Sequence, residues 1–347
     1  MIYNEPKKLK EKFSPFRIAW LFPDSTCDTN PSNRLRRYQL SDYFNSLGDF
    51  YPSESFRAGI SGYLKDKPAD MIGLLEKFDV VVIFNVAAYD AELVKLLKAK
   101  GKIVIFDHCE NIFGLGAEDD IMRNVSAITC CSSFLAEKTE SYLHSNLGID
   151  KPIFVVSDPI DNSVISSRAK FFNSSWNPPK SWGNTALIMG MGANVQYVLP
   201  FLDGLCKKTG YDMLILTEEG FTFPYTTKVW NVDSWISYAL QCTIALCYHD
   251  INQFPAKGNI KVTNPMSIGL PVIAPSMASY REAITDGYDG FIADTEEDWI
   301  KDMEALKDPD LRRTIGMRAR YKVLTKYGMD KIALDYLSMI GYLKSSK

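Results

Sequence analysis

Short apolar runs alternate with amphipathic stretches along the chain, and this alternation restricts it to the α/β class of folds. Helix-length segments separate the apolar runs, which predicts parallel strands joined by crossover helices. In the first half the expected strands are 17–22, 80–85, 102–107, 127–131 and 153–157. The expected helices there are 34–47, 91–100 and 133–147, and a glycine follows each of them as a C-terminal cap.

The alternation is interrupted once, by a stretch rich in Ser, Asn and Pro at 158–184 that is typical of a linker. Beyond it the expected strands are 186–191, 212–217, 243–248, 271–274 and 290–293. The expected helices are 195–208, 233–240, 259–268, 280–286, 296–306, 310–327 and 330–343. The 347 residues exceed the ~250–300 that one hydrophobic core usually supports, so the repeated pattern predicts two domains. We place them at 1–165 and 166–329, as two Rossmann-like doubly wound domains facing each other across a cleft.

The charge balance and the lack of targeting signals limit the function classes. Lys and Arg number 39 against 42 Asp and Glu, a net charge of −3, so general nucleic-acid binding is not expected. No apolar stretch as long as that of a signal peptide follows the basic start of the chain. No apolar run approaches the ~20 residues of a membrane span. We therefore expect a cytoplasmic protein that contacts the inner face of a membrane at most peripherally.

Cysteine and histidine usage argues against a metal site. The seven cysteines are odd in number and form no Cys-x-x-Cys, and none of the three histidines has ligand spacing to a cysteine pair. We expect reduced, buried thiols and neither a metal nor another bound cofactor. Asp308-Pro309-Asp310 matches the Asp-x-Asp manganese motif, but no strand precedes it, so it predicts a helix N-cap followed by proline.

A cationic loop in the second half is the segment with the clearest chemical meaning. It delivers Lys257, Gly258 and Asn259 to the expected helix 259–268, whose free backbone N–H groups and partial positive charge suit a phosphate. Lys261 adds a second charge at i+4, and Asn264 offers an amide to a sugar hydroxyl about one turn later. The alternative is a solvated loop and an ordinary surface helix.

Three runs around this loop resemble a known family. The runs 264–273 (NPMSIGLPVI), 280–284 (YREAI) and 287–292 (GYDGFI) resemble the donor-binding half of retaining glycosyltransferases with the two-Rossmann-domain (GT-B) architecture, most of all family 4. The tail of that domain is matched by Trp299, Leu311, Arg312, Gly316 and Ala319. The resemblance implies transfer from a nucleotide-sugar, such as a UDP- or GDP-sugar, with retention and without a metal. It also implies that the final helix, within 330–347, returns to the N-terminal domain.

The resemblance also implies roles for residues outside the loop. The strand, glycine turn and helix start at 186–194 resemble the first such unit of the donor domain, which makes Gly190, Gly192 and Asn194 donor-binding candidates. Valine replaces the third glycine of a dinucleotide fingerprint, so the turn fits close approach to a phosphate or sugar, or simple packing.

In the N-terminal half, His108 follows the strand 102–107, at the position where a family histidine contacts the donor sugar. A buried structural histidine is the alternative. The acceptor, a saccharide or lipid-linked saccharide, is expected near Asn33, Arg34, Arg37 and Glu110.

One departure from the family leaves two hypotheses. Family 4 carries two glutamates eight positions apart, and this chain has Ala256 and Asn264 there. The first hypothesis is an active transferase of polysaccharide-assembly type, in which Lys257 and Lys261 replace part of that recognition. The second is a catalytically silent subunit of an assembly complex that binds a saccharide or a partner.

Overall fold

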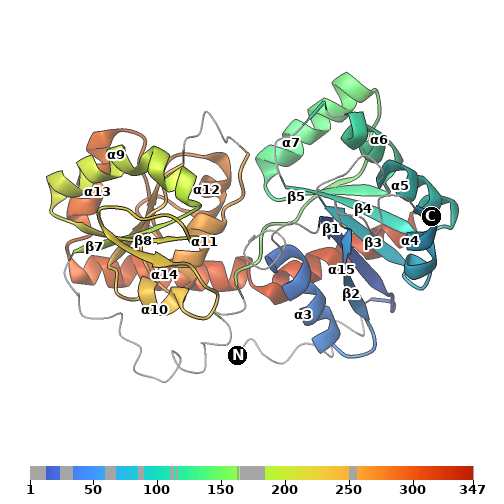
Figure 1. The fold of residues 1–347 in the computed structure, drawn as a ribbon, viewed down its shortest axis with the longest axis horizontal. Coiled ribbons are helices and arrows are strands. Elements are labelled where there is room, and N and C mark those ends of the chain that lie inside the picture. Colours follow the sequence, from blue (N-terminus) through green and yellow to red (C-terminus); the bar gives the residue numbers. More distant parts are fainter. Residues whose placement is uncertain are drawn as a thin grey trace. The chain divides into compact units, whose positions relative to one another are not determined.

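The chain forms two compact α/β units. The computed structural model describes residues 13–23, 34–58, 68–84, 90–109, 113–114, 116–161, 164, 184–249 and 256–346. Contacts divide the chain into one unit of 1–159 with 329–347 and a second unit of 160–328 (Figure 1). The predicted boundary was 165/166, and most of the predicted linker, at 162–163 and 165–183, lies outside the described residues.

The first unit contains a six-stranded sheet with the order β2-β1-β3-β4-β5-β6, in which all the pairs are parallel. Its strands are β1 (Ile18–Pro23), β2 (Ser53–Ala58), β3 (Val80–Phe84), β4 (Ile103–His108), β5 (Ala127–Cys130) and β6 (Ile153–Val155). Five of the six were predicted from their apolar runs. β2 was missed because it is an edge strand that pairs only with β1, and its first three residues, 53–55, are all polar.

Helices flank this sheet in the order expected for crossover connections. They are the π-helical segment η1 (Arg34–Gln39), α3 (Leu40–Ser46), α4 (Pro68–Leu75), α5 (Asp90–Ala99), α6 (Gly116–Asn124), α7 (Ser133–Tyr142) and the π-helical segment η2 (Leu143–Leu147). Ser132 caps α7, since its hydroxyl accepts a hydrogen bond from the Leu135 backbone N–H at 3.2 Å. Gly48, Gly101 and Gly148 have the positive φ angles expected of the predicted caps.

The last helix, α15 (Met329–Ser345), belongs to the first unit although it ends the chain. It packs against α3, and its Tyr336 ring meets the buried Trp20 ring of β1 edge-on at 5.1 Å between centroids. Lys344 donates a hydrogen bond from Nζ to the Pro15 carbonyl at 3.1 Å. The helix therefore returns to the N-terminal unit, as the resemblance implied.

The second unit has a parallel six-stranded sheet of its own, with the order β12-β11-β10-β7-β8-β9. Its strands are β7 (Thr185–Met189), β8 (Asp212–Thr217), β9 (Thr226–Val229), β10 (Ile244–Leu246), β11 (Val272–Ala274) and β12 (Phe291–Ile292). Its helices are α9 (Gly192–Thr209), α10 (Trp235–Ala239), α11 (Ile260–Ser267), α12 (Ala278–Ala283), α13 (Glu296–Ala305) and α14 (Pro309–Lys326). All but the edge strand β9 were predicted within a few residues.

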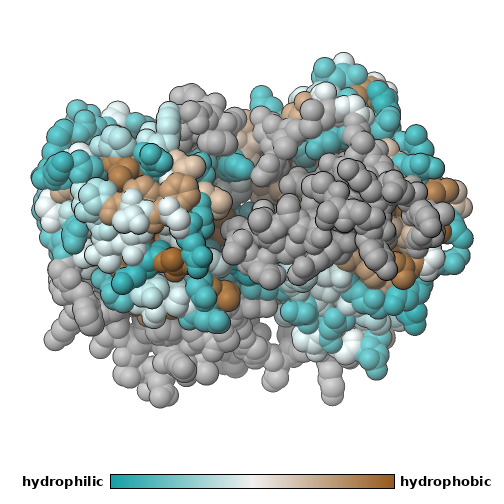
Figure 2. Space-filling view, viewed as in Figure 1, coloured by the Kyte–Doolittle hydropathy of each residue, from teal (hydrophilic) through white to brown (hydrophobic). Residues whose placement is uncertain are grey.

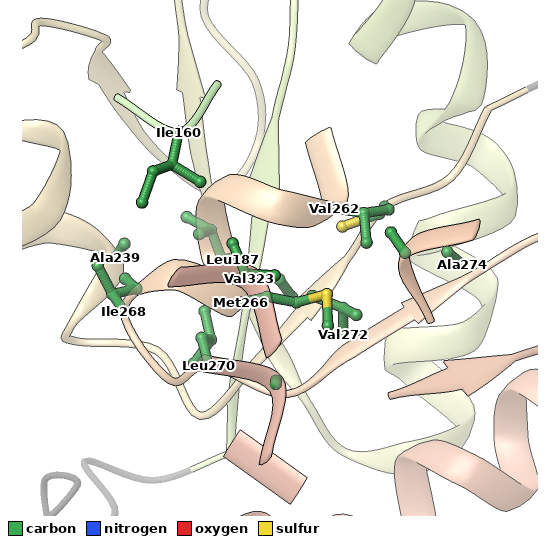
Figure 3. Close-up of a cluster of buried hydrophobic side chains, with 14 of the residues drawn as sticks. Ile160, Leu187, Ala239, Val262, Met266, Ile268, Leu270, Val272, Ala274 and Val323 are labelled. Atoms are coloured by element: carbon green, nitrogen blue, oxygen red, sulfur yellow. The ribbon is translucent and has the colours of Figure 1, made fainter. Parts of the chain in front are cut away.

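Burial of one face fixes the orientation of α11. Figure 3 shows Val262 and Met266 of this helix gathered with Leu187 of β7 and Val272 of β11, and all four are almost fully buried. Val262 and Met266 are four residues apart and share one helix face. Because that face is held in the core, Lys261 and Asn264 are presented from fixed positions.

Outside the cores, the described surface visible in Figure 2 is mainly hydrophilic, with separate hydrophobic patches. Among the described residues no helix is long and apolar enough to cross a membrane. The six described cysteines are free and buried, as predicted, while Cys27 lies outside the described residues.

A glycine contact holds α14 against the turn after α11. A Cβ added to Gly316 would lie 2.0 Å from the Gly269 carbonyl oxygen. Neither backbone can yield locally, so we predict that Gly316→Ala lowers the free energy of unfolding by about 1–3 kcal/mol in urea titrations. Gly204→Ala in α9 is the matched control, since an added Cβ there has no atom within 4 Å. It should stabilise the protein slightly, because alanine favours helix. Equal effects of the two substitutions would contradict this packing.

Candidate functional site

Three segments of the second unit meet around the ammonium group of Lys261. Its Nζ lies 3.2 Å from Nδ1 of His249, which follows β10, and 3.3 Å from the position that a Cβ would take at Gly190, which follows β7. β7 and β10 are neighbours in the sheet, so both segments lie at its carboxyl edge. Open α/β sheets bind their ligands at this edge. The lysine of the cationic loop therefore reaches the glycine turn, which the sequence had placed in a separate motif.

The charge at this edge is held in a partly desolvated setting. Burial, together with the nearby charge of Lys257, lowers the pKa of Lys261 from its ordinary value of 10.5. The loop that carries Lys257 is fixed to α12, because the Ser279 hydroxyl donates to the Lys257 carbonyl at 2.7 Å. Two lysines and the start of α11 thus form a cationic group of the kind that binds phosphate.

The two asparagines of the motif are both buried. Asn259 precedes α11 and is 1% exposed, and its side chain lies beside Tyr327, which follows α14. Its carbonyl accepts from the Val262 and Thr263 backbone N–H groups, both at 2.9 Å. These contacts make Asn259 part of the helix start. Like the side-chain amide of Asn259, the Oδ1 of Asn264 is buried and has no hydrogen-bond partner among the described residues.

The glycine turn between β7 and α9 is packed by the protein itself. A Cβ at Gly192 would lie 2.1 Å from the Phe221 ring, so glycine is required there for packing. The Gly192 N–H donates to both carboxylate oxygens of Glu218, at 3.0 and 2.9 Å, which places an internal anion at the start of α9. Asn194 is half-buried in the first turn of that helix. Gly192 is therefore explained by packing against Phe221. Gly190, in contrast, lies next to Lys261.

In the first unit, His108 ends β4 and is 3% exposed. Its ring lies beside those of Phe106 and Phe113, with centroids 5.5 and 5.2 Å away. Burial lowers the pKa of His108 to about 4, so the imidazole is neutral at physiological pH. Its Nε2 is buried without a hydrogen-bond partner among the described residues. Its predicted contact with the donor sugar stays a prediction.

A buried ion network lies next to His108, and the sequence had not predicted it. Asp107 accepts from Arg36 Nε at 3.0 Å and Nη2 at 2.7 Å, and from Arg37 Nη2 at 3.1 Å. Arg36 also donates to Asp158 at 3.1 Å, and the Thr129 hydroxyl donates to Asp107 at 2.8 Å. The network ties η1 to β4, β5 and the segment after β6.

The network includes Arg37, one of the acceptor-side candidates. Arg37 is 0% exposed, is bound to Asp107, and lies over the Phe84 ring at 3.3 Å. Its charge is neutralised internally because the π-helical segment turns it toward the strand ends. Arg34 is 7% exposed. The other acceptor-side candidates, Asn33 and Glu110, lie outside the described residues.

The described residues contain no group of three or more His, Cys, Asp or Glu side chains that could hold a metal ion. Asp308 caps α14, accepting from the Asp310 backbone N–H at 2.9 Å with Pro309 in the first turn, so the N-cap prediction is confirmed. A narrow hollow in the second unit is lined by Lys261 together with Met189 and Cys247, and two depressions that are more open lie beside Tyr225 and beside Tyr321.

Comparison with known proteins decides the fold. The sequence matches no protein-family model and no curated protein. Among solved structures, a glycosyltransferase from Rickettsia africae has a TM-score of 0.70 at 12% identity, covering 96% of this chain and 100% of its own. Sucrose-phosphate synthase from Thermosynechococcus elongatus has a TM-score of 0.66 at 11% identity, covering 96% and 100%. The chain has the GT-B fold.

A third similar structure was solved with ligands. Anabaena HepE, in complex with UDP and glucose, has a TM-score of 0.65 at 11% identity and covers 94% of this chain and 99% of its own. At these identities the likeness establishes the GT-B architecture, and the chemistry must be argued from this chain's own residues.

Proposed function

We propose that the protein is a glycosyltransferase that moves a sugar from a nucleotide-sugar to a saccharide or lipid-linked saccharide, with retention and without a metal. The observation that carries the proposal is the Lys261 ammonium, held 3.2 Å from His249 Nδ1 beside the glycine turn of a GT-B donor unit. Similar structures include HepE in complex with UDP-glucose, and this fits a UDP-sugar as donor. We further propose a cytoplasmic role in polysaccharide biosynthesis, at most peripheral to the membrane.

The chemistry would rest on charge stabilisation of the leaving group. As the bond between the anomeric carbon and the diphosphate breaks, negative charge develops on the diphosphate. Lys261, Lys257 and the start of α11 would stabilise that charge from preorganised positions. The buried Oδ1 of Asn264, which has no hydrogen-bond partner among the described residues, would accept a hydrogen bond from a ribose hydroxyl, more weakly than a carboxylate would. No carboxylate nucleophile is assigned, and we therefore propose no covalent intermediate.

A silent binding subunit is the second candidate, and one observation favours it. Ala256, which stands at the first of the two acidic positions of the family, is an apolar residue that is 2% exposed. A carboxylate is therefore missing where the family has one. Such a subunit would bind a saccharide or a partner without transferring a sugar.

Calorimetric titration with a panel of nucleotide-sugars separates these candidates, followed by product detection with saccharide and lipid-linked acceptors. Binding followed by transfer supports the enzyme. Binding of a donor without transfer to any acceptor favours the silent subunit. Failure to bind any nucleotide would contradict the proposed transferase activity.

Replacing Lys257 should have a moderate effect on nucleoside diphosphate binding. We predict that Lys257→Ala weakens binding of the nucleoside diphosphate by about five- to tenfold, because one charge near the phosphates is lost while Lys261 stays in place. The dissociation constant from calorimetry is the readout. Lys228→Ala on the edge strand β9 serves as the control and should leave it unchanged. An unaltered constant in Lys257→Ala would refute its role.

Donor binding should weaken at alkaline pH. The protonated Lys261 binds the diphosphate, and this form is lost as the pH rises through the pKa of the lysine. Because burial and Lys257 lower that pKa, the loss begins below the ordinary value of 10.5. Dissociation constants measured from neutral to alkaline pH should rise in the wild type and stay flatter in Lys261→Gln. Parallel profiles for the two proteins would exclude Lys261 as the titrating group.

A further inference from the structure

We propose that His249 is a positioning residue that fixes the Lys261 ammonium at the glycine turn and thereby sets the affinity for the nucleoside diphosphate. This inference rests on the proposed function and extends it to a residue outside the cationic loop. His249 lies in the segment after β10, whereas Lys261 lies in the first turns of α11. The Nδ1 of His249 lies 3.2 Å from the Nζ of Lys261.

The chemistry of the two groups fixes the direction of this hydrogen bond. A lysine ammonium has three donors and no acceptor. Nδ1 of His249 must therefore accept, and the ring proton of the neutral imidazole must lie on Nε2. The ring is 8% exposed, so it occupies a fixed place at the sheet edge.

The setting of Lys261 explains why such a partner matters. A lysine side chain is flexible, and holding it in one conformation costs rotamer entropy. Here the backbone of Lys261 is held by the Cys247 thiol, which lies 3.1 Å from its carbonyl oxygen. The far end is held by His249, and Gly190 leaves the room that the ammonium occupies. The rotamer entropy of the Lys261 side chain is therefore already lost in the free protein, so ligand binding does not have to order it.

Two neutral polar substitutions of His249 separate a positioning role from a general structural role. The amide of asparagine is attached at Cγ, as Nδ1 is, so His249→Asn keeps an acceptor at the level of Nδ1. The amide of glutamine lies one bond further, at the level of Nε2, so His249→Gln moves the acceptor away from Lys261. Both variants remove the ring and keep a neutral polar group, and each is therefore the control for the other.

The readouts are the dissociation constants for uridine diphosphate and guanosine diphosphate, and the rate at which an amine-reactive reagent labels Lys261, followed by mass spectrometry. We expect His249→Asn to bind the tighter of the two nucleotides within about threefold of the wild type. His249→Gln should bind it about tenfold more weakly and should label Lys261 faster. Thermal melting of both variants checks that the fold is kept.

Equal dissociation constants for wild type, His249→Asn and His249→Gln would overturn the inference. An equal loss in both folded variants would overturn it too, because the ring and not the acceptor would then matter. If the wild type binds neither nucleotide, nor any other nucleoside diphosphate, the proposed function fails, and the labelling rates of Lys261 then decide whether His249 positions it. Faster labelling of Lys261 in His249→Gln alone would then show that the contact itself exists, and would assign the failure to the proposed function.

Discussion

Replacing Arg36 with methionine should lower the free energy of unfolding by about 3–5 kcal/mol, the largest change expected from any single substitution discussed above. Arg36 is 1% exposed and makes charge-assisted hydrogen bonds to Asp107 and Asp158 as well as one to the Val156 carbonyl at 2.8 Å. Methionine retains much of the volume but leaves buried carboxylates without their main counter-charge. Urea unfolding measures the loss.

Two further measurements locate this effect. Hydrogen exchange should accelerate in β4 and β5 of the first unit and remain unchanged in the second sheet. Lys77 forms an ion pair with Glu54, and both side chains are 49% exposed. Lys77→Met removes this pair and should lower the free energy of unfolding by less than about 1 kcal/mol. If Arg36→Met were no more destabilising than Lys77→Met, the network would not hold the first unit together.

The same network makes the first unit sensitive to acid. Burial alone would raise the pKa of Asp107, but the charges of and hydrogen bonds from Arg36 and Arg37 outweigh it and lower the pKa from 3.8 to about 2. Its folded-state pKa lies below the unfolded value, so its stabilisation is present above pH 3.8 and is lost as the pH falls toward about 2.

Reversing the charge of Lys261 should have the largest effect on ligand binding. We expect Lys261→Glu to weaken nucleoside diphosphate binding by about 100- to 1000-fold, because a charge-assisted contact is replaced by repulsion between two anions. Lys261→Met, which keeps the apolar stem, should lose only the contact, about 10- to 30-fold. Calorimetry measures both constants.

A charge reversal at an exposed lysine of the same unit is the control. Lys207 lies in the last turn of α9, and its side chain is 73% exposed and paired with Asp203. Lys207→Glu should leave the nucleotide dissociation constant within about twofold of the wild type, since exposed charges at a distance are screened by salt. Similar losses in Lys207→Glu and Lys261→Glu would mean that the overall charge of the unit, and not a local site, governs binding.

The architecture could be predicted because it depends on patterns that survive without knowledge of partners. Buried parallel strands are continuous apolar runs, so β3, β4 and β5 were found, and glycine caps such as Gly101 and Gly148 ended the helices correctly. The helix of the cationic loop, expected at 259–268, is α11 at Ile260–Ser267. The edge strand β2 was missed since it lacks such a run.

The site was less predictable, because its contacts join distant parts of the chain. Arg37 was expected near the acceptor, and the buried network that Arg36 and Arg37 form with Asp107, which is 71 and 70 residues away, was not predicted. One signal was available: Asp107 is an acidic residue at the end of a predicted central strand. Likewise Lys261 was predicted near the start of the helix 259–268, where α11 places it, but nothing in the sequence pairs it with His249. The position of His249, just after the predicted strand 243–248, was the one sign that it lies at the carboxyl edge of the sheet.

Release of nucleoside diphosphate from a nucleotide-sugar tests the central claim most directly, because slow donor hydrolysis needs no acceptor. The wild-type protein, incubated with a panel of UDP- and GDP-sugars, should release the diphosphate from at least one of them. Lys261→Glu should release it at least about 100-fold more slowly at the same donor concentration, while Lys207→Glu keeps the wild-type rate. The absence of release from every donor, or equal rates in wild type and Lys261→Glu, would contradict an active donor site at Lys261.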